Sequence, residues 1–465
     1  MVNRWQNQEE AFQFAMGHPS CMLDMEMGTG KTRVAIDVAF ARLDVTKVLV
    51  VCPKAVIPVW PKELAKHSGG RVYSCWTRDV KKTVAANSLS LDKFITPRCK
   101  PGEVKFAIVN YDTVWKAQIG DTILKCRFDM VILDESHRAK SAGSKVSKYL
   151  AMLGKRVKYK LCLSGTPMAN SPLDVYGQFR FLDNTIFGTN HNSFLQEYAI
   201  MGGPEKRFVV GLKNQNKLNE KFRSITYSCK MADVADKLKL PESLPPVVLP
   251  VTIPTKDMRT SKQLSKEFIA ECGQGHVVVK NVLVKMLRLQ QIAAGFCQVQ
   301  GSPLEPAGIE ELNTTKEDTL VSILEDVSPG LPVVVFCVFQ HDLDAVHRSA
   351  ERAGRGCDEL SGRVNQLEDW RNSEGHVLAV QIQAGAEGVD MTKAHHAVYF
   401  SLPHSLAMYN QSKARLYRPG QSNPVSFIHL VAEGTIDEAM YASLERKKDV
   451  IEAVKDGSFD FGFMK

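Results

Sequence analysis

The stretch Met22–Thr32, MLDMEMGTGKT, constrains the fold more than any other part of the sequence. A short apolar piece, Cys21–Leu23, leads into the glycine-rich turn, and apolar residues at helical spacing follow it. Strand, glycine-rich turn and helix are the context of a phosphate-binding loop, because glycines let backbone N–H groups close around a phosphate and the helix N-terminus adds partial positive charge. Lys31 would reach the β- and γ-phosphates, and the Thr32 hydroxyl would bind Mg²⁺.

The match to the phosphate-loop pattern is incomplete. The full pattern has a further glycine at the position that Met25 occupies. An ordinary loop followed by a helix cap is therefore an alternative interpretation of Gly28–Thr32 until other parts of the chain are considered.

Length and composition indicate an ordinary globular protein of more than one domain. The chain has 465 residues, 44% of them hydrophobic and 24% charged, which predicts two or three domains with sizeable cores. The formal net charge of +8 is compatible with a polyanionic partner, although a solvated basic surface explains it equally well. Eleven cysteines without a CxxC pair favour reduced thiols and disfavour a zinc ribbon.

Short apolar runs alternate with helical patterns along both halves of the chain. Because polar or turn residues follow each run, buried parallel strands with a site at their carboxyl ends are expected. No run approaches the length needed to span a bilayer, and no signal peptide precedes the first domain, so we expect a cytoplasmic protein of a bacterium or a phage-infected host, with no membrane partner. The predicted strands are Lys47–Val51, Lys105–Val109, Met130–Leu133, Tyr159–Leu163, Val333–Phe336, Val377–Gln381, Ala397–Phe400 and Val425–His429.

The regions between these strands divide the chain. Leu173–Ile200 and Lys213–Phe222 show no strand alternation, and Met258–Ala270, Val277–Ala294 and Glu317–Leu324 are predicted to be helical. The segment 241–254, PESLPPVVLPVTIP, holds five prolines, which exclude a helix or a central strand. We interpret it as part of a crossing, 241–256, between two domains. The first domain is 1–240, with a helical part from about 171, and the second is 257–465.

An acidic pair, Asp134–Glu135, directly follows the strand that ends at Leu133. At this place, Asp134 would hold Mg²⁺ through water and Glu135 would orient and deprotonate an attacking water. An Asp and a Glu that cap the next helix are an equally good interpretation of the pair alone. The segment Ser164–Pro167, SGTP, also follows a strand; its hydroxyls could contact the acidic pair, or it could be a simple turn.

In the second half, Ala384–Asp390 follows a predicted strand, and Gln411–Gln421 carries two arginines. Arg415 and Arg418 are three residues apart, so we expect them on one helical face. A guanidinium fork suits a triphosphate, and if the halves face each other these side chains would act as arginine fingers. A charged surface helix is the alternative.

The ordered set of motifs resembles the SNF2-like group of superfamily 2 helicase-type ATPases, with the small phage or bacterial members as the nearest type. The resemblance covers about residues 5 to 450, and it departs where Leu402–Ser405, LPHS, replaces the family's WNP-type signature. The matching segments are WQNQEEAF around Gln8 (Q motif), GTGKT (motif I), VVCPKAVIPVW (Ia), VNYD (Ib), DESH (II), SGTPMAN (III), Leu173–Phe187, LRLQQIAAG, VVVFCVFQHDLDAV (IV), AGAEGVDM (V) and QSKARLYRPGQ (VI).

This resemblance implies an α/β fold of two RecA-like domains in tandem, each a mainly parallel sheet flanked by helices, with SNF2-type helical insertions. It implies ATP bound between the lobes, with Lys31, Asp134, Glu135, Arg415 and Arg418 as catalytic residues and Mg²⁺ at Thr32 and Asp134. The implied nucleotide-binding residues are Gln8, Met27, Gly28, Thr29, Gly30, Lys31, Thr32, Arg33, Gly388 and Asp390. The implied nucleic-acid contacts are Lys54, Asn110, Tyr111, Thr166 and Gln340, for each of which a structural role is an equal alternative.

The function expected from this resemblance is ATP-driven movement along, or remodelling of, double-stranded or branched DNA without sequence specificity, by a monomer that a protein partner could target. A strand-separating helicase acting on single-stranded DNA or RNA is the alternative within the same class. A non-catalytic adaptor with a helicase fold would be expected to lack one of the catalytic residues, and all are present. A P-loop enzyme acting on a small metabolite would not explain the second set of motifs.

Overall fold

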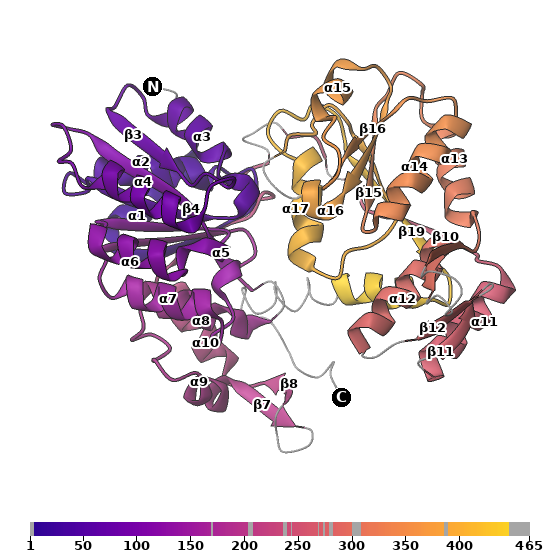
Figure 1. Cartoon of the computed structure of the whole chain (residues 1–465), viewed down its shortest axis with the longest axis horizontal. Helices are drawn as coiled ribbons and strands as arrows, with labels where there is room; N and C mark the ends of the chain where they lie inside the picture. The colour runs from indigo at the N-terminus through magenta and orange to yellow at the C-terminus, as the bar shows by residue number, and fades with distance from the viewer. Residues whose placement is uncertain are drawn as a thin grey trace. The chain divides into compact units, whose positions relative to one another are not determined.

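The computed structural model describes residues 4–168, 171–202, 208–235, 240–242, 244–267, 269–272, 275–278, 282–299, 308–385 and 389–445. These residues form two compact units, unit 1 up to residue 235 and unit 2 from residue 240. Each unit is built around its own parallel β-sheet with helices beside it (Figure 1). The predicted α/β class with two parallel sheets is therefore confirmed.

The sheet of unit 1 has seven parallel strands in the order β3-β4-β2-β5-β6-β1-β9. Its central strands are buried along their whole length because both faces are covered, which explains why they are continuous apolar runs in the sequence. The strands are β1 (Ser20–Met25), β2 (Lys47–Cys52), β3 (Tyr73–Thr77), β4 (Val104–Asn110), β5 (Met130–Asp134), β6 (Tyr159–Ser164) and β9 (Thr226–Cys229).

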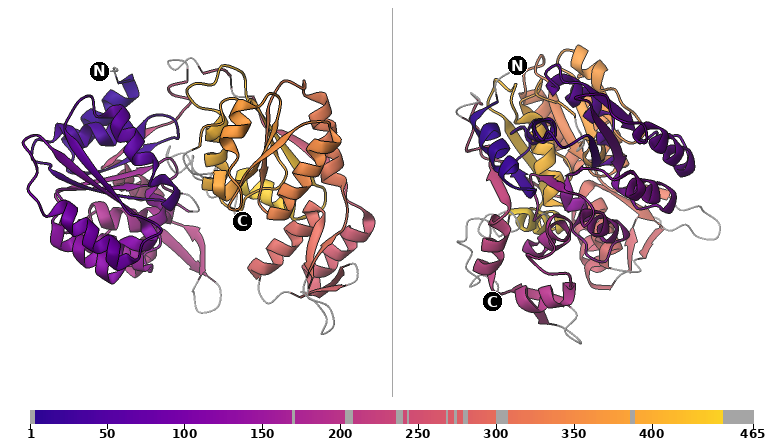
Figure 2. Two further views of the ribbon diagram at one scale, coloured as in Figure 1. Left: turned by 45° about the horizontal axis from the view of Figure 1, so that its top comes forward. Right: turned by 90° about the vertical axis from the view of Figure 1, so that its left-hand side faces the viewer.

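The helices of unit 1 contact one another in two groups beside this sheet, α1 to α3 and α4 to α8. Beyond α8, the chain forms α9, the hairpin β7–β8 and α10, which project from the unit (Figure 2). The helices are α1 (Gln6–Gly17), α2 (Lys31–Ala41), α3 (Val59–His67), α4 (Val84–Ile95), α5 (Tyr111–Val114), α6 (Ala117–Cys126), α7 (Lys145–Gly154), α8 (Val175–Leu182), α9 (His191–Tyr198) and α10 (Gln215–Arg223), with single turns η1 (Lys54–Val56), η2 (Ser136–Ala139) and η3 (Pro172–Asp174).

The projecting part corrects one sequence-based prediction. Residues 173–200 were expected to contain no strand, but Ile200 belongs to β7 (Ala199–Gly202), which pairs antiparallel with β8 (Phe208–Leu212). An aromatic cluster of Phe179, Phe187 and Phe194 joins α8 to α9. The pairing partner of β7 lies beyond the predicted segment, so local periodicity could not reveal it.

The sheet of unit 2 has six parallel strands in the order β10-β19-β18-β15-β17-β16. Helices α13 and α14 lie on one side of it, and α16 and α17 lie on the other (Figure 1). The strands are β10 (Val247–Val251), β15 (Val333–Cys337), β16 (Cys357–Leu360), β17 (Val377–Gln381), β18 (His396–Tyr399) and β19 (Ser426–Ala432); the helices are α11 (Thr255–Glu267), α12 (Val282–Ala294), α13 (Thr315–Asp326), α14 (Gln340–Arg352), α15 (Leu367–Asn372), α16 (Ile382–Gly385) and α17 (Leu406–Leu416).

Two features of unit 2 differ from the sequence-based expectation. The predicted helices 258–270 and 277–294 are interrupted by a hairpin, β11 (Ile269–Cys272) and β12 (Gly275–Val278), so α11 ends at Glu267 and α12 begins at Val282. A second small hairpin joins β13 (Phe296–Val299) and β14 (Gly308–Glu311). The proline-rich stretch contributes β10, which lies at the edge of the sheet, where a proline in the strand is tolerated.

Both units have large apolar cores. In unit 2, for example, Val333, Val335, Val377, Val398 and Leu430 form one buried cluster between the sheet and its helices. Within the described ranges, no helix combines the length and the apolar character that crossing a lipid bilayer requires. The ten cysteines whose side chains are described are all free thiols, and most of them are buried.

Candidate functional site

The loop between β1 and α2 has the geometry of a phosphate cradle. Gly28 and Gly30 have φ angles of 85° and 94°, in the left-handed region that disfavours other residues. Gly30 is the residue before α2, so Lys31 begins the helix and the first free N–H groups of α2 face the loop. The buried Thr29 side chain donates a 2.6 Å hydrogen bond to the Glu26 carbonyl and fixes the turn. The loop therefore presents the backbone donors and partial positive charge that bind a phosphate.

Gln8 packs directly against this loop. Its side-chain amide donates to the Thr29 carbonyl at 3.4 Å, and the neighbouring Asn7 amide donates to the same carbonyl at 3.1 Å. A Cβ atom at Gly30 would lie 2.2 Å from the Gln8 Nε2, so another residue here would displace the Gln8 side chain as well as adopt an unfavourable φ angle. Gln8 is thus placed beside the phosphate loop by α1, and its role in nucleotide binding stays a prediction.

The acidic pair lies beside Lys31. Asp134 ends β5, and Glu135 follows in a left-handed conformation with φ 52°, which is strained for a residue with a side chain. The Lys31 Nζ lies 3.6 Å from the Glu135 Oε1, and the side chains of both residues are nearly buried. Glu135 makes no side-chain cap to the helical turn η2, so the helix-cap interpretation of the pair does not apply to it. The fold has joined two segments about one hundred residues apart in sequence.

Burial and the neighbouring Glu135 charge raise the pKa of Asp134 to about 6, while Lys31 and a hydrogen bond from Trp60 act in the opposite direction. Two adjacent buried carboxylates with one lysine between them carry an excess of negative charge, which a divalent cation would offset. The Asp134 carboxylate and the Thr32 hydroxyl are hard oxygen donors of the kind that Mg²⁺ prefers. Among the described residues, no cluster of three or more His, Cys, Asp or Glu forms a metal cage, and Mg²⁺ beside phosphates does not need one.

The segment after β6 is tied to the acidic pair. Nδ1 of His137 lies 3.5 Å from the Glu135 Oε2 and 3.4 Å from the Ser164 Oγ, and the Thr166 N–H donates to that same hydroxyl oxygen at 3.1 Å. Burial lowers the pKa of His137, so its ring is neutral near pH 7. The predicted contact between the SGTP hydroxyls and the acidic segment therefore runs through His137.

Two residues that the sequence-based reasoning missed complete this part of the site. Gln178 on α8 accepts a 2.7 Å hydrogen bond from the Ser136 hydroxyl and donates one of 2.7 Å to the Pro167 carbonyl. Trp60 on α3 donates a 2.9 Å hydrogen bond to the Asp134 Oδ2. Both lie in motif-like segments, but nothing in their local pattern shows which distant group they contact.

In unit 2, the segments around Asp390 and Arg415 are joined. The Met391 N–H donates to the Arg415 carbonyl at 3.1 Å, and the buried Gln421 side chain donates to the Ala394 carbonyl at 2.9 Å. Burial acts to raise the pKa of Asp390, but hydrogen bonds from Thr392 and nearby guanidinium charges lower it by more. The net shift of this pKa is therefore downward. Gly388 lies outside the described residues.

The prediction that Arg415 and Arg418 lie on one helical face is wrong. Helix α17 ends at Leu416, so Arg415 lies in its last turn and Arg418 lies in the turn that follows. Gly420, with φ 108°, allows the chain to reverse there and enter the segment that Gln421 anchors. The two arginines are thus close in sequence but are carried by different local structures, and their approach to a γ-phosphate stays a prediction.

The predicted nucleic-acid contacts differ in exposure. Lys54 in η1 and Gln340 at the start of α14 are exposed, and Thr166 is half-buried. Asn110 and Tyr111 are buried: the Tyr111 hydroxyl donates to the Asp134 carbonyl at 2.9 Å, and the Asn110 amide donates to Asp112 at 3.3 Å. The side chains of Asn110 and Tyr111 therefore contact protein atoms in this structure.

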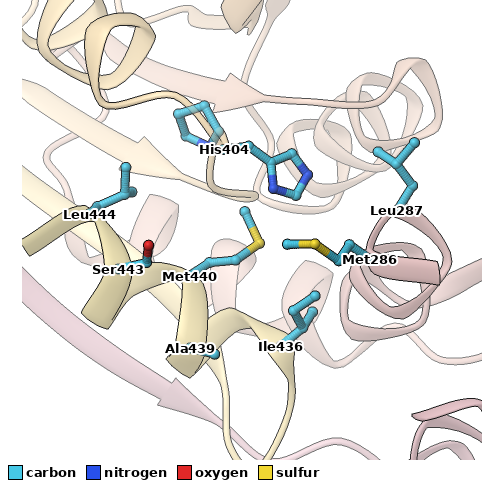
Figure 3. Close-up of a pocket in the computed structure, with 9 residues that line it drawn as sticks. Met286, Leu287, His404, Ile436, Ala439, Met440, Ser443 and Leu444 are labelled. Atoms are coloured by element: carbon cyan, nitrogen blue, oxygen red, sulfur yellow. The ribbon is translucent and has the colours of Figure 1, made fainter. Parts of the chain in front are cut away.

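Unit 2 also holds an apolar cavity of about 520 Å³ (Figure 3). The thioethers of Met286 and Met440 point toward each other across it, and His404, from the segment that departs from the family signature, lies at its edge. Leu287, Ile436 and Leu444 provide more apolar lining. The residues that line the cavity include no Lys or Arg, and none of them belongs to the site described above.

Comparison with known proteins assigns the family. Residues 1–294 match the model of the SNF2-related domain, and residues 315–420 match that of the helicase conserved C-terminal domain. The mouse protein named DNA annealing helicase and endonuclease ZRANB3 is 24% identical over 98% of this chain, which spans 42% of the mouse protein. Putative protein p41 of Acyrthosiphon pisum secondary endosymbiont phage 1 is 26% identical over 92% of this chain and 94% of its own length.

Among solved structures, the Sulfolobus solfataricus SWI2/SNF2 ATPase core in complex with dsDNA aligns with 98% of this chain and 94% of its own, at 18% identity and a TM-score of 0.44. The family assignment depends on the sequence models, of which the first alone covers more than half of the chain. The protein therefore belongs to the SNF2-related family, with a helicase conserved C-terminal domain after its SNF2-related domain.

Proposed function

We propose that this protein is an ATP-dependent DNA translocase of the SNF2 type, which couples ATP hydrolysis to movement along, or remodelling of, duplex or branched DNA. The observation that carries the proposal is the 3.6 Å approach of Lys31 to Glu135 beside a loop built for phosphate. Family membership supports nucleotide use. The names of the relatives, among them the human DNA repair and recombination protein RAD54B, support DNA as the polymer.

In the proposed reaction, Lys31 binds the β- and γ-phosphates, and the Glu135 carboxylate accepts a proton from the water that attacks the γ-phosphorus. The bond from the γ-phosphorus to the bridging oxygen breaks, and ADP leaves with that oxygen. His137 contacts Glu135 and Ser164, so it would hold the Glu135 carboxylate in place. Thr32 and Asp134 would hold Mg²⁺, which neutralises phosphate charge when bound. Arg415 and Arg418 would stabilise the charge that develops on the γ-phosphoryl group.

The DNA would contact exposed or half-buried polar groups at the carboxyl ends of the strands, with Lys54, Thr166 and Gln340 as the available candidates. Such groups bind backbone phosphates, so binding should be independent of sequence and sensitive to salt. We also propose that the protein acts in the cytoplasm as a monomer, since one chain supplies both sets of motifs, and that a protein partner or a DNA structure directs it.

The test is the steady-state rate of ATP hydrolysis without nucleic acid and with single-stranded, duplex and forked DNA and with RNA, at two salt concentrations. Stimulation by duplex or forked DNA that weakens at high salt is the expected result. Stimulation by single strands alone would replace the proposal with a strand-separating helicase. A wild-type protein that no nucleic acid stimulates would contradict it and favour the adaptor.

The arginine assignment has its own test. Arg418→Ala should leave nucleotide affinity within about twofold and reduce DNA-stimulated turnover about 1,000-fold, because an arginine finger acts on the transition state. Arg371→Ala, which removes another guanidinium near Asp390, is the matched control. Equal turnover in Arg418→Ala and the control would remove Arg418 from the catalytic residues.

A further inference from the structure

Two buried aromatic side chains donate hydrogen bonds to the same residue, Asp134. The Trp60 indole N–H donates to the carboxylate Oδ2, and the Tyr111 hydroxyl donates to the backbone carbonyl, each at 2.9 Å. Trp60 and Tyr111 are 1% and 3% exposed, and Asp134 is 5% exposed. Water therefore cannot replace these donors, and each bond is made in a dry environment where its geometry matters most.

The two donors arrive from the connections that follow neighbouring strands. Trp60 lies on α3 after β2, Tyr111 begins α5 after β4, and Asp134 ends β5. In the sheet, β2 pairs with β4 on one side and with β5 on the other, so the Tyr111 side chain reaches past the end of β2. The carboxyl ends of three adjacent strands are thereby joined at one carboxylate-bearing residue.

Each bond constrains a different feature of the acidic pair. The Trp60 bond occupies one carboxylate oxygen, restricts rotation of the carboxylate and leaves Oδ1 for other partners. The Tyr111 bond holds the peptide unit that links Asp134 to Glu135, the residue kept at φ 52°. A strained conformation persists only where its surroundings enforce it, so the Tyr111 hydroxyl contributes to keeping Glu135 aimed at Lys31.

The same connections also carry exposed polar groups. Lys54 lies in η1, which contacts α3, so a ligand that moves η1 would also move the helix that carries Trp60. Asp112 in α5 and Trp115 directly after α5 line an open depression of about 380 Å³, together with Arg138 and Lys145. Tyr111 also lines this depression, so nucleic acid bound in it would be separated from Asp134 by one side chain, whereas nucleic acid bound at Lys54 would act through η1 and α3.

We propose that Trp60 and Tyr111 are positioning residues that hold Asp134 and Glu135 in the metal-competent arrangement and transmit the binding of nucleic acid at the β2–α3 and β4–α5 connections to that pair. The part of this proposal that concerns nucleic-acid binding rests on the proposed function. The part that concerns metal binding depends only on the contacts of Asp134. Partners behind a metal ligand typically change metal affinity or activity by about 10- to 100-fold when they are removed.

A packing role for the two rings is the competing explanation, and the chain offers a matched control. Trp76 in β3 belongs to the same unit, is 9% exposed and donates its indole N–H to the Ser90 hydroxyl at 2.8 Å. Trp76→Phe therefore removes one hydrogen bond from an indole N–H and a similar ring volume, at a position that makes no hydrogen bond to Asp134. Trp60→Phe and Tyr111→Phe keep a ring in place and remove only the donor and a few atoms.

The experiment measures the affinity for a fluorescent ADP analogue in EDTA and in saturating Mg²⁺, and separately the stimulation of hydrolysis by duplex DNA. In Trp60→Phe we expect the gain in affinity that Mg²⁺ provides to fall about 10-fold, with affinity in EDTA within about twofold of wild type. Both Trp60→Phe and Tyr111→Phe should lose most of the DNA stimulation. Trp76→Phe should match wild type in every measurement.

A Trp60→Phe protein that keeps the full effect of Mg²⁺ and the full DNA stimulation, as the Trp76 variant does, would overturn the proposal. If Trp60→Phe fails to fold, as judged by circular dichroism, Tyr111→Phe decides the question, because it removes a single oxygen atom; unchanged stimulation in that variant would also overturn it. If nucleic acid does not stimulate even the wild type, the proposed function fails, while the Mg²⁺ measurement still decides whether Trp60 positions Asp134.

Discussion

The two units handle buried charge in different ways at the carboxyl ends of their strands. In unit 1, the adjacent Asp134 and Glu135 share Lys31, whose amine is 3.6 Å from Glu135. In unit 2, Lys316 on α13 and Asp437 form a single ion pair of 2.6 Å, with side chains 2% and 1% exposed. The Lys316 amine also donates to the Phe400 carbonyl at 3.0 Å, so this charge is hydrogen-bonded as well as paired.

This difference distinguishes the candidate ligand-binding cluster of unit 1 from the structural ion pair of unit 2. The unit 1 cluster has more negative than positive charge; burial first, and then the adjacent Glu135 carboxylate, raise the pKa of Asp134 to about 6. Excess buried negative charge favours a bound cation, and it costs stability when the cation is absent. The unit 2 pair is neutral overall and joins α13, the end of β18 and the segment after β19, so its role is to hold these elements together.

The largest expected effect comes from changing the unit 1 cluster. Glu135→Gln should reduce turnover about 1,000-fold or more, because a general base is lost, while nucleotide stays bound. Lys31→Ala should abolish turnover and also weaken nucleotide binding, since it removes the phosphate contact. The melting temperature of Glu135→Gln should equal or exceed that of wild type, because the variant relieves excess negative charge. Hydrolysis rates, nucleotide titration and calorimetry measure the three quantities; retained turnover in either variant would place the site elsewhere.

The next effect, on the unit 2 pair, is expected on stability. Lys316→Ala leaves Asp437 buried without its counter-charge, which should cost about 3–5 kcal/mol of unfolding free energy and lower the melting temperature. Replacing both residues together with Met and Leu should recover most of that loss, because the uncompensated charge is gone.

The control for this variant is the surface pair of Lys158 and Asp44, which has the same 2.6 Å distance but side chains 66% and 49% exposed. Lys158→Ala should leave the melting temperature unchanged, since solvent screens such a pair. Equal melting temperatures for Lys316→Ala and Lys158→Ala would break the comparison, because burial would then have no consequence for the unit 2 pair.

Local patterns predicted much of the fold. Strands such as β2, β5 and β15 are buried on both faces, so they are continuous apolar runs whose ends are marked by polar residues, and their predicted bounds differ from the observed ones by a residue or two. The glycine-rich loop and the acidic pair were also recognisable from local sequence, because phosphate and metal binding require glycine, lysine and carboxylates at particular spacings.

Features that depend on distant partners were not predictable. The β11–β12 hairpin interrupts a helical pattern because its two strands satisfy each other's backbone groups, and helix α17 ends before Arg418 where the chain turns toward the carbonyls that bind Gln421. Trp60 contacts Asp134 from 74 positions away in the sequence. In the sequence, it is one more apolar residue after a strand, and only the pairing of β2 with β5 brings it beside Asp134.

The smallest of the expected effects is a pH dependence within unit 2. Burial lowers the pKa of His429 to about 4, although a hydrogen bond to the Val247 carbonyl acts in the opposite direction. Its Nε2 lies 2.9 Å from the Tyr409 hydroxyl, and its ring stacks on Tyr399 at 4.8 Å. Neutral His429 is therefore part of the core, and protonation favours the unfolded chain.

The sign of the effect follows from the two pKa values. Between pH 6.5 and about 4 the unfolded chain binds a proton at this histidine that the folded chain does not, so stability falls as pH falls, by at most about 3 kcal/mol. Asp342 in the same unit has a pKa raised to about 6, so acid has the opposite effect there, and the His429 contribution must be isolated by difference.

We expect His429→Gln to be less stable than wild type at pH 7.5, because it loses the stacked ring, but to lose less stability between pH 6.5 and 4.5. Calorimetry at several pH values measures both slopes. If His429→Gln keeps the wild-type slope, burial of the histidine is not the origin of the pH dependence in unit 2, and the contrast between the two units would be limited to the ion pair.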